Sequence, residues 1–211
     1  TIDTATYERN REAADTENRF VFPCKNTGKI CLFTNTGQLY TLKAMDLPFG
    51  KFRDKGVPID NVSNYDSSKE TIIYAASQSD LNLYRLIFAT KQAMLKIVDG
   101  GEFDVAKRTV AATKLQDNDE VVNVTVLKEQ RNIVLQSKEG YFLRFAIEEI
   151  PEKKKGAIGV RGMKLGVKDE VEAVYYTQNA VEQTISYGSR QLELNKIKLA
   201  KRDGKGVKVR A

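Results

Sequence analysis

Hydrophobic residues in this chain occur in short runs separated by polar turns, and the runs are rich in β-branched and aromatic residues. The stretch Gly140–Leu165 shows the pattern most clearly. Tyr141–Ile147 is an apolar run, Glu152–Gly156 is a loop with three lysines, and Ile158–Leu165 is a second apolar run. Short runs of this composition, bounded by Gly and Pro, predict β-strands rather than helices.

The order of strand, basic loop and strand occurs four times along the chain. The copies begin at Gly37, Ala93, Gly140 and Ser189, which gives spacings of 56, 47 and 49 residues. Sequence periods of this size are typical of solenoids, propellers and arrays. Four-stranded units that repeat around an axis form a propeller, in which each blade covers the next. We therefore predict an all-β, propeller-like fold of four-stranded blades, with an irregular β-sandwich as the alternative.

The chain is predicted to form a single domain over residues 1–211. Its four units are 19–70, 71–119, 120–169 and 170–211. Residues 1–18 are polar with a helix-compatible piece at Glu8–Asp15, and we interpret them as a linker or the end of a preceding blade in a longer protein. A fifth blade is either partly supplied by this segment or missing. The expected strands are Arg19–Phe22, Ile30–Thr34, Gln38–Lys43, Val57–Val62, Thr71–Ala76, Leu83–Thr90, Ala93–Val98, Val110–Leu115, Val121–Leu127, Asn132–Ser137, Tyr141–Ile147, Ile158–Leu165, Val171–Thr177, Glu182–Tyr187, Gln191–Leu194 and Val207–Arg210. The residues expected to fill the layers between blades include Val122, Val124, Ile133, Leu135, Phe142 and Ile185.

Basic residues outnumber acidic ones, and the excess lies toward the C-terminal end. The chain has 34 Lys and Arg against 28 Asp and Glu, with no histidine, for a net charge of +6. Residues 190–211 hold eight basic residues against two acidic ones, whereas residues 1–18 hold five acidic against two basic. A single basic loop is best explained as solvated surface, but basic loops at the same place in every repeat indicate an anionic partner.

The sequence offers few groups for catalysis or metal binding. The absence of histidine excludes His-based triads and His acid–base pairs, and there is no glycine-rich phosphate loop. The acidic pairs Asp119-Glu120 and Asp169-Glu170, each followed by Val, could in principle hold a metal. Because they recur at unit junctions, we predict a capping or turn role for them instead. The nine tyrosines are interpreted as strand and core residues, so no catalytic residue or metal ligand is expected.

The two cysteines, Cys24 and Cys31, flank a predicted turn at Lys25–Ile30 and could face each other across a hairpin. A disulfide is one alternative, but two buried free thiols in a cytosolic protein is the favoured interpretation. Two thiolates without histidine do not supply the four ligands of a zinc site.

The repeats resemble the C-terminal domain of the A subunit of bacterial type IIA DNA topoisomerases, which are gyrase and topoisomerase IV. Repeats of that family run from a glycine through a strand and a loop to G-V-x-x-x-x-L, followed by an acidic pair and valine. Gly159–Leu165 followed by Asp169-Glu170-Val171 fits best, Lys55–Val62 fits well, and Thr90–Leu115 fits less closely. The opening residues resemble the end of a blade. The likeness covers essentially the whole chain and implies a β-pinwheel, a propeller-like ring whose blades exchange strands.

In the gyrase branch of this family, one blade loop carries a box of Gln, basic, Arg, Gly, Gly, basic and Gly. Ala200–Gly206 agrees with the box at five of seven positions, with Ala200 in place of the glutamine and Asp203 in place of a glycine. The family places the box in its first blade, whereas this copy lies in the last unit, and Lys153–Gly159 is a poorer version. These departures favour a topoisomerase IV-type protein, and both branches stay open.

The resemblance implies that the domain binds and bends duplex DNA around its rim, without reading base sequence, and guides DNA for strand passage. Loops between the third and fourth strands of each unit would form this rim, and their glycines would let backbone amides approach phosphates. The expected DNA-binding residues are Lys51, Arg53, Lys55, Lys107, Arg108, Lys153, Lys154, Lys155, Arg161, Lys164, Lys201, Arg202, Lys205, Lys208 and Arg210.

The resemblance also implies a monomeric fragment without a cofactor of its own. The parent topoisomerase would use ATP and Mg²⁺ elsewhere, and its other parts would be the rest of the A subunit plus an ATPase B subunit, in the bacterial cytoplasm at the nucleoid. No apolar run approaches the roughly 20 residues of a membrane helix, and the start shows no signal-peptide pattern. The alternative is a propeller that binds protein partners near its axis, with lysines that only solubilise it. A continuous basic belt would distinguish the first hypothesis from the second.

Overall fold

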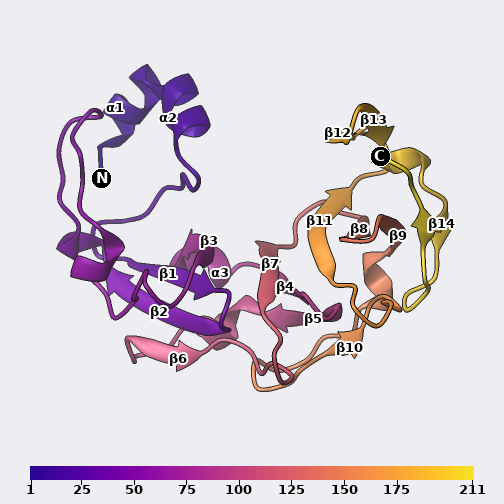
Figure 1. Ribbon diagram of the computed structural model, residues 1–211. Coiled ribbons are helices and arrows are strands. Elements are labelled where there is room, and N and C mark those ends of the chain that lie inside the picture. The colour runs from indigo at the N-terminus through magenta and orange to yellow at the C-terminus, as the bar shows by residue number, and fades with distance from the viewer.

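The computed structural model describes residues 1–211 and shows β-sheets that follow one another along an open arc (Figure 1). Two short helices, α1 (Thr4–Arg9) and α2 (Arg11–Glu17), lie at one end of the arc. The hairpin of β12 (Thr184–Tyr187) and β13 (Arg190–Glu193) lies at the other end. The predicted all-β, propeller-like class is confirmed.

Three larger sheets form the arc. The first contains β1 (Lys29–Thr34), β2 (Gln38–Lys43), β3 (Ile72–Ser77) and β6 (Thr109–Ala111). The second contains β4 (Arg85–Thr90), β5 (Met94–Asp99), β7 (Val121–Val126) and β10 (Val160–Arg161). The third contains β8 (Asn132–Ser137), β9 (Tyr141–Ala146), β11 (Val171–Thr177), β14 (Leu199–Ala200) and β15 (Val207–Lys208). The connections include α3 (Gln78–Leu81) and the 3-10 helices Ala44–Asp46, Ile59–Asn61, Gly100–Phe103, Ile147–Glu149 and Leu194–Lys196.

Each larger sheet takes its strands from two consecutive sequence units. From the concave to the convex side of the arc, the strand orders are β3-β1-β2-β6, β7-β4-β5-β10 and β11-β8-β9-β14, and β15 also pairs with β9 (Figure 1). The two central strands are a hairpin of one unit, and the inner and outer strands come from the next unit. The exchange of strands between blades that the resemblance implies is therefore present.

Apolar side chains fill the layers between successive sheets. Twelve buried residues pack between the first and second sheets, where the Phe33 ring lies 5.1 Å from Phe103 and 5.8 Å from Phe88. Thirteen more, including Leu95 and Phe145, pack between the second and third sheets. Burial of one such side chain stabilises the fold by about 1.5–3 kcal/mol, so these layers hold the arc together.

The residues predicted for these layers lie in them. Val124 is in the layer between the first and second sheets, and Ile133 and Leu135 are in the next. Phe142 packs with Leu194 against the β12–β13 hairpin. Val122 and Ile185 are half-buried against these clusters.

The predicted strands at the ends of the units differ most from the structure. Arg19–Phe22 is irregular, and Val57–Val62 contains a 3-10 helix. In the later units, the first and last strands pair with the central hairpin of the preceding unit. The segments Arg19–Phe22 and Val57–Val62 of the first unit pair with no strand of the structure. Phe20 and Phe22 instead pack against the free face of the first sheet. The outer strands predicted in the later units are shortened to two or three residues in β6, β10 and β15.

Residues 1–18 form helices rather than strands of a preceding blade. The Asp3 carboxylate accepts a hydrogen bond from the backbone N–H of Thr6 at 2.7 Å and caps α1. The helical segment is longer than the predicted Glu8–Asp15 and breaks at Asn10. No helix of the structure has the length and apolar character needed to cross a membrane.

Both cysteines are free thiols. Cys31 is buried, its Sγ lies 3.1 Å from Oε1 of Gln78, and burial raises the pKa of the Cys31 thiol to about 12. Cys24 is only half-buried. The expectation of two buried thiols is therefore correct for Cys31 alone.

Candidate nucleic-acid interface

Three of the predicted basic loops lie on the convex side of the arc. β6 and β10 are the outermost strands of the first two sheets, β14 and β15 both pair with the outer side of β9 in the third, and a loop with Lys and Arg precedes or borders each of them (Figure 1). Each outer strand pairs with the second strand of the preceding hairpin. The loops around Lys107, Lys153 and Lys201 therefore occupy the same structural place in successive sheets.

The loop at Lys153–Lys155 is attached to the second sheet through Lys96 on β5 and through Glu102 in the 3-10 helix that follows β5. The Lys96 ammonium on β5 donates to the carbonyl oxygens of Lys154 and Lys155, both at 3.0 Å. The backbone N–H of Lys155 donates to Oε1 of Glu102 at 3.1 Å, and the Lys155 ammonium donates to the Glu102 carbonyl at 3.3 Å. Lys153 and Lys154 are exposed, whereas Lys155 is half-buried by these contacts.

The loop Ala200–Gly206 is attached to the outer strand of the second sheet and to the third sheet. The Arg202 guanidinium donates to the carbonyl oxygens of Glu149 at 3.0 Å and Arg161 at 2.8 Å. The backbone N–H of Lys164 donates to the Gly204 carbonyl at 2.8 Å. Arg202 is half-buried, so its side chain fixes the loop more than it faces solvent.

Asp203 occupies the box position where the family has a glycine. Its backbone has φ +67°, the left-handed conformation that glycine adopts readily. Arg161 donates to the Asp203 carboxylate through Nε at 2.5 Å and Nη2 at 3.0 Å, and this hydrogen bonding lowers the pKa of Asp203. Asp203 therefore keeps the loop conformation while neutralising one cation of the predicted interface.

Lysines at this end of the arc also surround an aromatic ring. The ammonium groups of Lys205 and Lys208 lie 5.1 and 5.0 Å from the ring centre of Tyr141. The predicted strand and core role of Tyr141 is confirmed on β9, where the ring is half-buried against the apolar layer. The same ring also faces two cations, an arrangement that the sequence pattern did not predict.

The loop of the second unit carries Lys107 and Arg108 against the first sheet. Thr41 on β2 donates its N–H to the Arg108 carbonyl at 3.0 Å and its hydroxyl to the Lys107 carbonyl at 3.1 Å. Both basic side chains are exposed, although the Arg108 guanidinium also donates to the Val62 carbonyl at 3.1 Å.

The basic loop of the first unit lies elsewhere. The N–H of Gly50 donates to the Thr1 carbonyl at 3.0 Å, and the Arg53 guanidinium lies 3.0 Å from the Glu17 carboxylate. Lys51, Arg53 and Lys55 therefore lie beside the N-terminal helices, not on the outer edge of a sheet. The structure places the loops around Lys107, Lys153 and Lys201 on the convex side and leaves Lys51, Arg53 and Lys55 apart from them.

Several predicted residues are exposed and have no hydrogen-bond or ion-pair partner for their side chains. These are Lys51, Lys55, Lys107, Lys153, Lys164, Lys201, Lys205 and Arg210, of which Lys205 lies near the Tyr141 ring. Cations without an internal partner are the ones best able to contact phosphates, because no existing ion pair has to break.

The glycines at the ends of these loops have a structural role that the sequence did not predict. We expected them to bring backbone amides close to phosphates. Gly159 and Gly206 have φ +103° and +83°, and a Cβ at Gly206 would lie 2.6 Å from the Phe142 carbonyl oxygen. A Cβ at Gly159 would collide with the Leu95 carbonyl oxygen in the same way. These glycines let the outer segment approach the central strand of the sheet. Gly56, at the matching place in the first unit, has open space around it.

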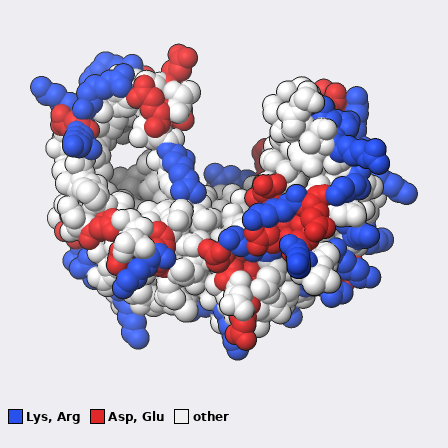
Figure 2. All heavy atoms as spheres, in the orientation of Figure 1, with Lys and Arg blue, Asp and Glu red and all other residues white.

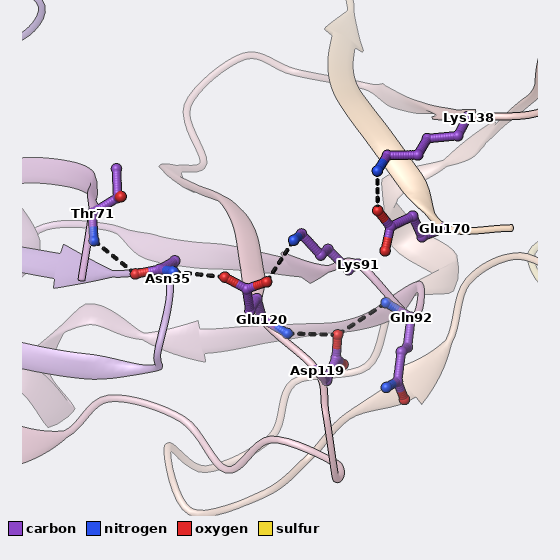
Figure 3. Close-up of polar contacts among 8 residues, drawn as sticks. All are labelled: Asn35, Thr71, Lys91, Gln92, Asp119, Glu120, Lys138 and Glu170. Carbon is purple, nitrogen blue, oxygen red and sulfur yellow. Dashed lines mark hydrogen bonds and ion pairs between the residues drawn. The ribbon is translucent and has the colours of Figure 1, made fainter. Parts of the chain in front are cut away.

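Acidic pairs join the units at their boundaries, as Figure 3 shows. The Asp119 carboxylate accepts from the backbone N–H groups of Gln92 at 3.0 Å and Glu120 at 2.8 Å. Glu120 in turn accepts from Asn35 at 2.7 Å and pairs with Lys91 at 2.5 Å. The turns of two successive hairpins are therefore bound to one acidic pair, and the predicted turn role is confirmed.

The equivalent contacts recur one unit later. The Asp169 carboxylate accepts from the N–H groups of Glu139 at 3.0 Å and Glu170 at 2.9 Å, and Lys138 pairs with Glu170.

No group of three or more Cys, Asp or Glu side chains is placed to hold a metal ion. Figure 2 shows acidic side chains gathered over the middle of one face and basic ones along the outer edge over the C-terminal half.

Polar residues on the central strands were missed by the sequence analysis of the site. Lys96 is buried in β5, and Arg144 on β9 donates to the carbonyl oxygens of Asn195 and Ile197, both at 3.1 Å. The available signal was a lone cation within an apolar strand, as in Met94–Asp99. A buried Lys or Arg needs internal partners, and these partners lie about 50–60 residues away in the chain.

The sequence matches the family described as "DNA gyrase C-terminal domain, beta-propeller" over residues 28–75, 84–128, 131–178 and 191–210. Among curated proteins, it is 29% identical over 188 residues to the DNA gyrase A protein of Lawsonia intracellularis, covering 84% of this chain and 23% of that protein. It is 28% identical over 188 residues to the DNA gyrase A protein of Staphylococcus aureus, covering 85% and 21%. The chain thus spans less than a quarter of the length of these relatives.

Solved structures share the fold. The C-terminal domain of a DNA topoisomerase IV superposes with a TM-score of 0.80 at 23% identity, covering 98% of this chain and 67% of the other. The E. coli ParC C-terminal domain gives 0.73 at 18% identity over 89% and 78%. A DNA gyrase A C-terminal domain gives 0.64 at 22% identity over 87% and 60%.

Proposed function

The chain belongs to the DNA gyrase C-terminal domain family, and from this premise we propose that it binds duplex DNA along its convex side and bends it. The observation that supports the proposal best is the repeated position of three basic loops on the outer strands of successive sheets. A curved row of cations matches a curved phosphate backbone without reading bases, because phosphate contacts position DNA but carry no sequence information.

The energy balance is favourable to bending on such a surface. Bending a site of about 20–30 base pairs costs on the order of 1–6 kcal/mol, which added contacts along the curve can offset. The loops are already attached to the sheets through Lys96, Thr41 and Arg202, so little loop ordering remains for the DNA to supply.

The wider role follows from the relatives. We infer that the chain is the C-terminal part of the A subunit of a type IIA topoisomerase, where it guides DNA segments for strand passage. The parent enzyme would act with an ATPase B subunit, with Mg²⁺ bound elsewhere, in the bacterial cytoplasm. The relatives include both gyrase and topoisomerase IV. The ion pair between Asp203 and Arg161 lowers the free charge of the box-like loop and favours a topoisomerase IV-type role.

A propeller that binds protein partners is the second candidate. The acidic middle of the face in Figure 2 is the surface that such a partner would use. The acidic pairs at the unit boundaries, however, already bond to the hairpin turns, as Asp119 does to Gln92. We therefore favour the basic convex side as the functional surface.

A charge-matched pair of variants tests the proposal. One variant carries Lys107→Ala, Lys153→Ala and Lys201→Ala, which removes one unpaired lysine from each convex loop. The control carries Lys25→Ala, Lys128→Ala and Lys168→Ala, which removes the same charge from exposed positions outside these loops. Binding of labelled duplexes of about 20 and about 60 base pairs is measured over a salt series.

The proposal predicts tighter binding to the longer duplex and a log–log salt slope near −5 if about six phosphates are contacted. The convex variant should lose about three units of slope, because each phosphate contact contributes about 0.9, while the control keeps the slope of the unmodified chain. Equal losses in both variants, or binding that ignores duplex length, would refute the wrapping surface and favour the protein-partner hypothesis.

A further inference from the structure

Lys96 is the most unusual charged residue in the structure. It lies in the middle of β5 with 1% of its surface exposed, in a sheet whose neighbouring residues are apolar. Its ammonium donates to three carbonyl oxygens, of Lys154 and Lys155 at 3.0 Å and of Ala157 at 2.6 Å. An ammonium has three N–H donors, so all of its hydrogen-bonding capacity is used by one loop.

The three acceptors belong to the basic loop of the following unit, about 60 residues along the chain. The Lys96 ammonium also lies 5.6 Å from the ring centre of Phe88. Glu102 binds the same loop as a hydrogen-bond acceptor. Its carboxylate accepts the N–H of Lys155 at 3.1 Å and lies 3.9 Å from the Lys154 ammonium. The loop is thus held by a cation that binds its carbonyls and an anion that binds its N–H.

We propose that Lys96 is a positioning residue for DNA binding, which fixes the Lys153–Ala157 loop so that its lysines and not its carbonyl oxygens face the DNA. The inference rests on the proposed function. Carbonyl oxygens carry partial negative charge and would repel a phosphate if they pointed outward. Lys96 draws three of them toward the sheet and leaves Lys153 and Lys154 exposed.

Polar side chains on the equivalent strands of the other two sheets also bind carbonyl oxygens, but at a different strand position. Thr41 on β2 donates to the Lys107 carbonyl, and Arg144 on β9 donates to the carbonyls of Asn195 and Ile197. In each sheet a polar side chain of the second hairpin strand binds carbonyls of the next unit's outer segment. Lys96 is the third residue of β5, whereas Thr41 and Arg144 are each the fourth residue of their strands, so Lys96 projects from the opposite face of its sheet, and its contact with the basic loop is particular to the second sheet.

The first test measures the loop without DNA. Lys96→Met keeps an unbranched side chain that is one atom shorter and removes the donors. Lys43→Met is the control, since Lys43 is exposed at the end of β2. Amide hydrogen exchange across residues 153–157 should become faster in Lys96→Met and stay unchanged in Lys43→Met. Unchanged exchange in Lys96→Met would overturn the inference. If that variant does not fold, Glu102→Ala removes the acceptor of the Lys155 N–H and should accelerate exchange in the same loop.

The second test measures duplex binding in a double-mutant cycle. Lys96→Met should weaken binding by about tenfold, because the cost of ordering the loop is then met on association. The effect should largely disappear when Lys153→Ala and Lys154→Ala are already present, since a shared role makes the losses non-additive. Additive losses would overturn the inference, as a general loss of stability would produce them.

The outcomes separate the inference from the proposed function. If the unmodified chain binds duplex DNA with a steep salt slope and Lys96→Met binds equally well, the inference fails and the proposed function stands. If the unmodified chain binds no duplex, both the proposed function and the DNA role of Lys96 fail. The exchange rates would still report whether Lys96 fixes the loop.

Discussion

Replacement of Asp119 by alanine tests how the units are joined. Asp119 is 8% exposed, and its carboxylate accepts two backbone N–H groups, from Gln92 in one hairpin turn and from Glu120 just before the next inner strand. Asp119→Ala leaves both donors without an acceptor. A buried donor that loses its partner costs about 1–3 kcal/mol, and both sites are only partly buried, so we expect a total loss of about 2 kcal/mol.

Two further variants calibrate this value. Asp169→Ala removes the same contacts one unit later, but the N–H of Glu139 is exposed there and water can replace the carboxylate. We expect a loss of about 1 kcal/mol at that site. Asp117→Ala is the control, because Asp117 is exposed and its carboxylate makes no hydrogen bond, and its change should stay within about 0.5 kcal/mol.

The free energies of unfolding are obtained from urea titrations followed by circular dichroism. The expected order of destabilisation is Asp119→Ala first, Asp169→Ala second and Asp117→Ala last. If Asp119→Ala were as harmless as Asp117→Ala, the acidic pairs would not act as junctions, and their recurrence at unit boundaries would need another cause.

Two other changes address the outer strands and the buried lysine. Gly159→Ala places a Cβ against the Leu95 carbonyl at positive φ. It should destabilise the chain by more than Gly56→Ala, which carries only the backbone penalty of about 1–2 kcal/mol. Equal urea midpoints for the two variants would contradict the close approach of Gly159 to Leu95. Burial lowers the pKa of Lys96 from 10.5 to about 8 against the opposing effect of Glu102, so between these values the folded chain binds fewer protons than the unfolded chain. Stability should therefore rise with pH across this window relative to Lys96→Met. Unfolding titrations at about pH 7.5 and about pH 9.5 that show no relative rise would contradict the lowered pKa of Lys96.

Much of the architecture could be predicted from the chain alone. Short apolar runs that repeat with a period near 50 residues permit little except stacked four-stranded units, because each sheet has two apolar faces to bury. The turn at Gly37 and its counterparts at Ala93 and Gly140 marked the central hairpins correctly. These features are local, since a strand and its turn are specified by neighbouring residues.

The outer segments were less predictable, because their structure depends on distant partners and not on neighbouring residues. Val57–Val62 and Ile158–Leu165 have similar sequences, yet the first forms a 3-10 helix and the second contributes β10. What differs is the partner, since Val160 pairs with Leu95 on a preceding hairpin, whereas Val57–Val62 pairs with no strand of the structure. The pairing of a segment depends on residues far away in the chain.

The candidate site likewise has features that the local sequence specifies and features that depend on contacts between distant segments. The sequence by itself determined which loops are basic, because charge and repeat position can be counted directly. Only the tertiary structure decided which of these cations are unpaired, since Arg161 meets Asp203 and Arg53 meets Glu17 through contacts between distant segments. It also decided that the buried Lys96 belongs to the loop of the next unit. Hydrogen bonds of a buried ammonium are satisfied wherever the fold brings acceptors within reach, and strand exchange between units determines that place.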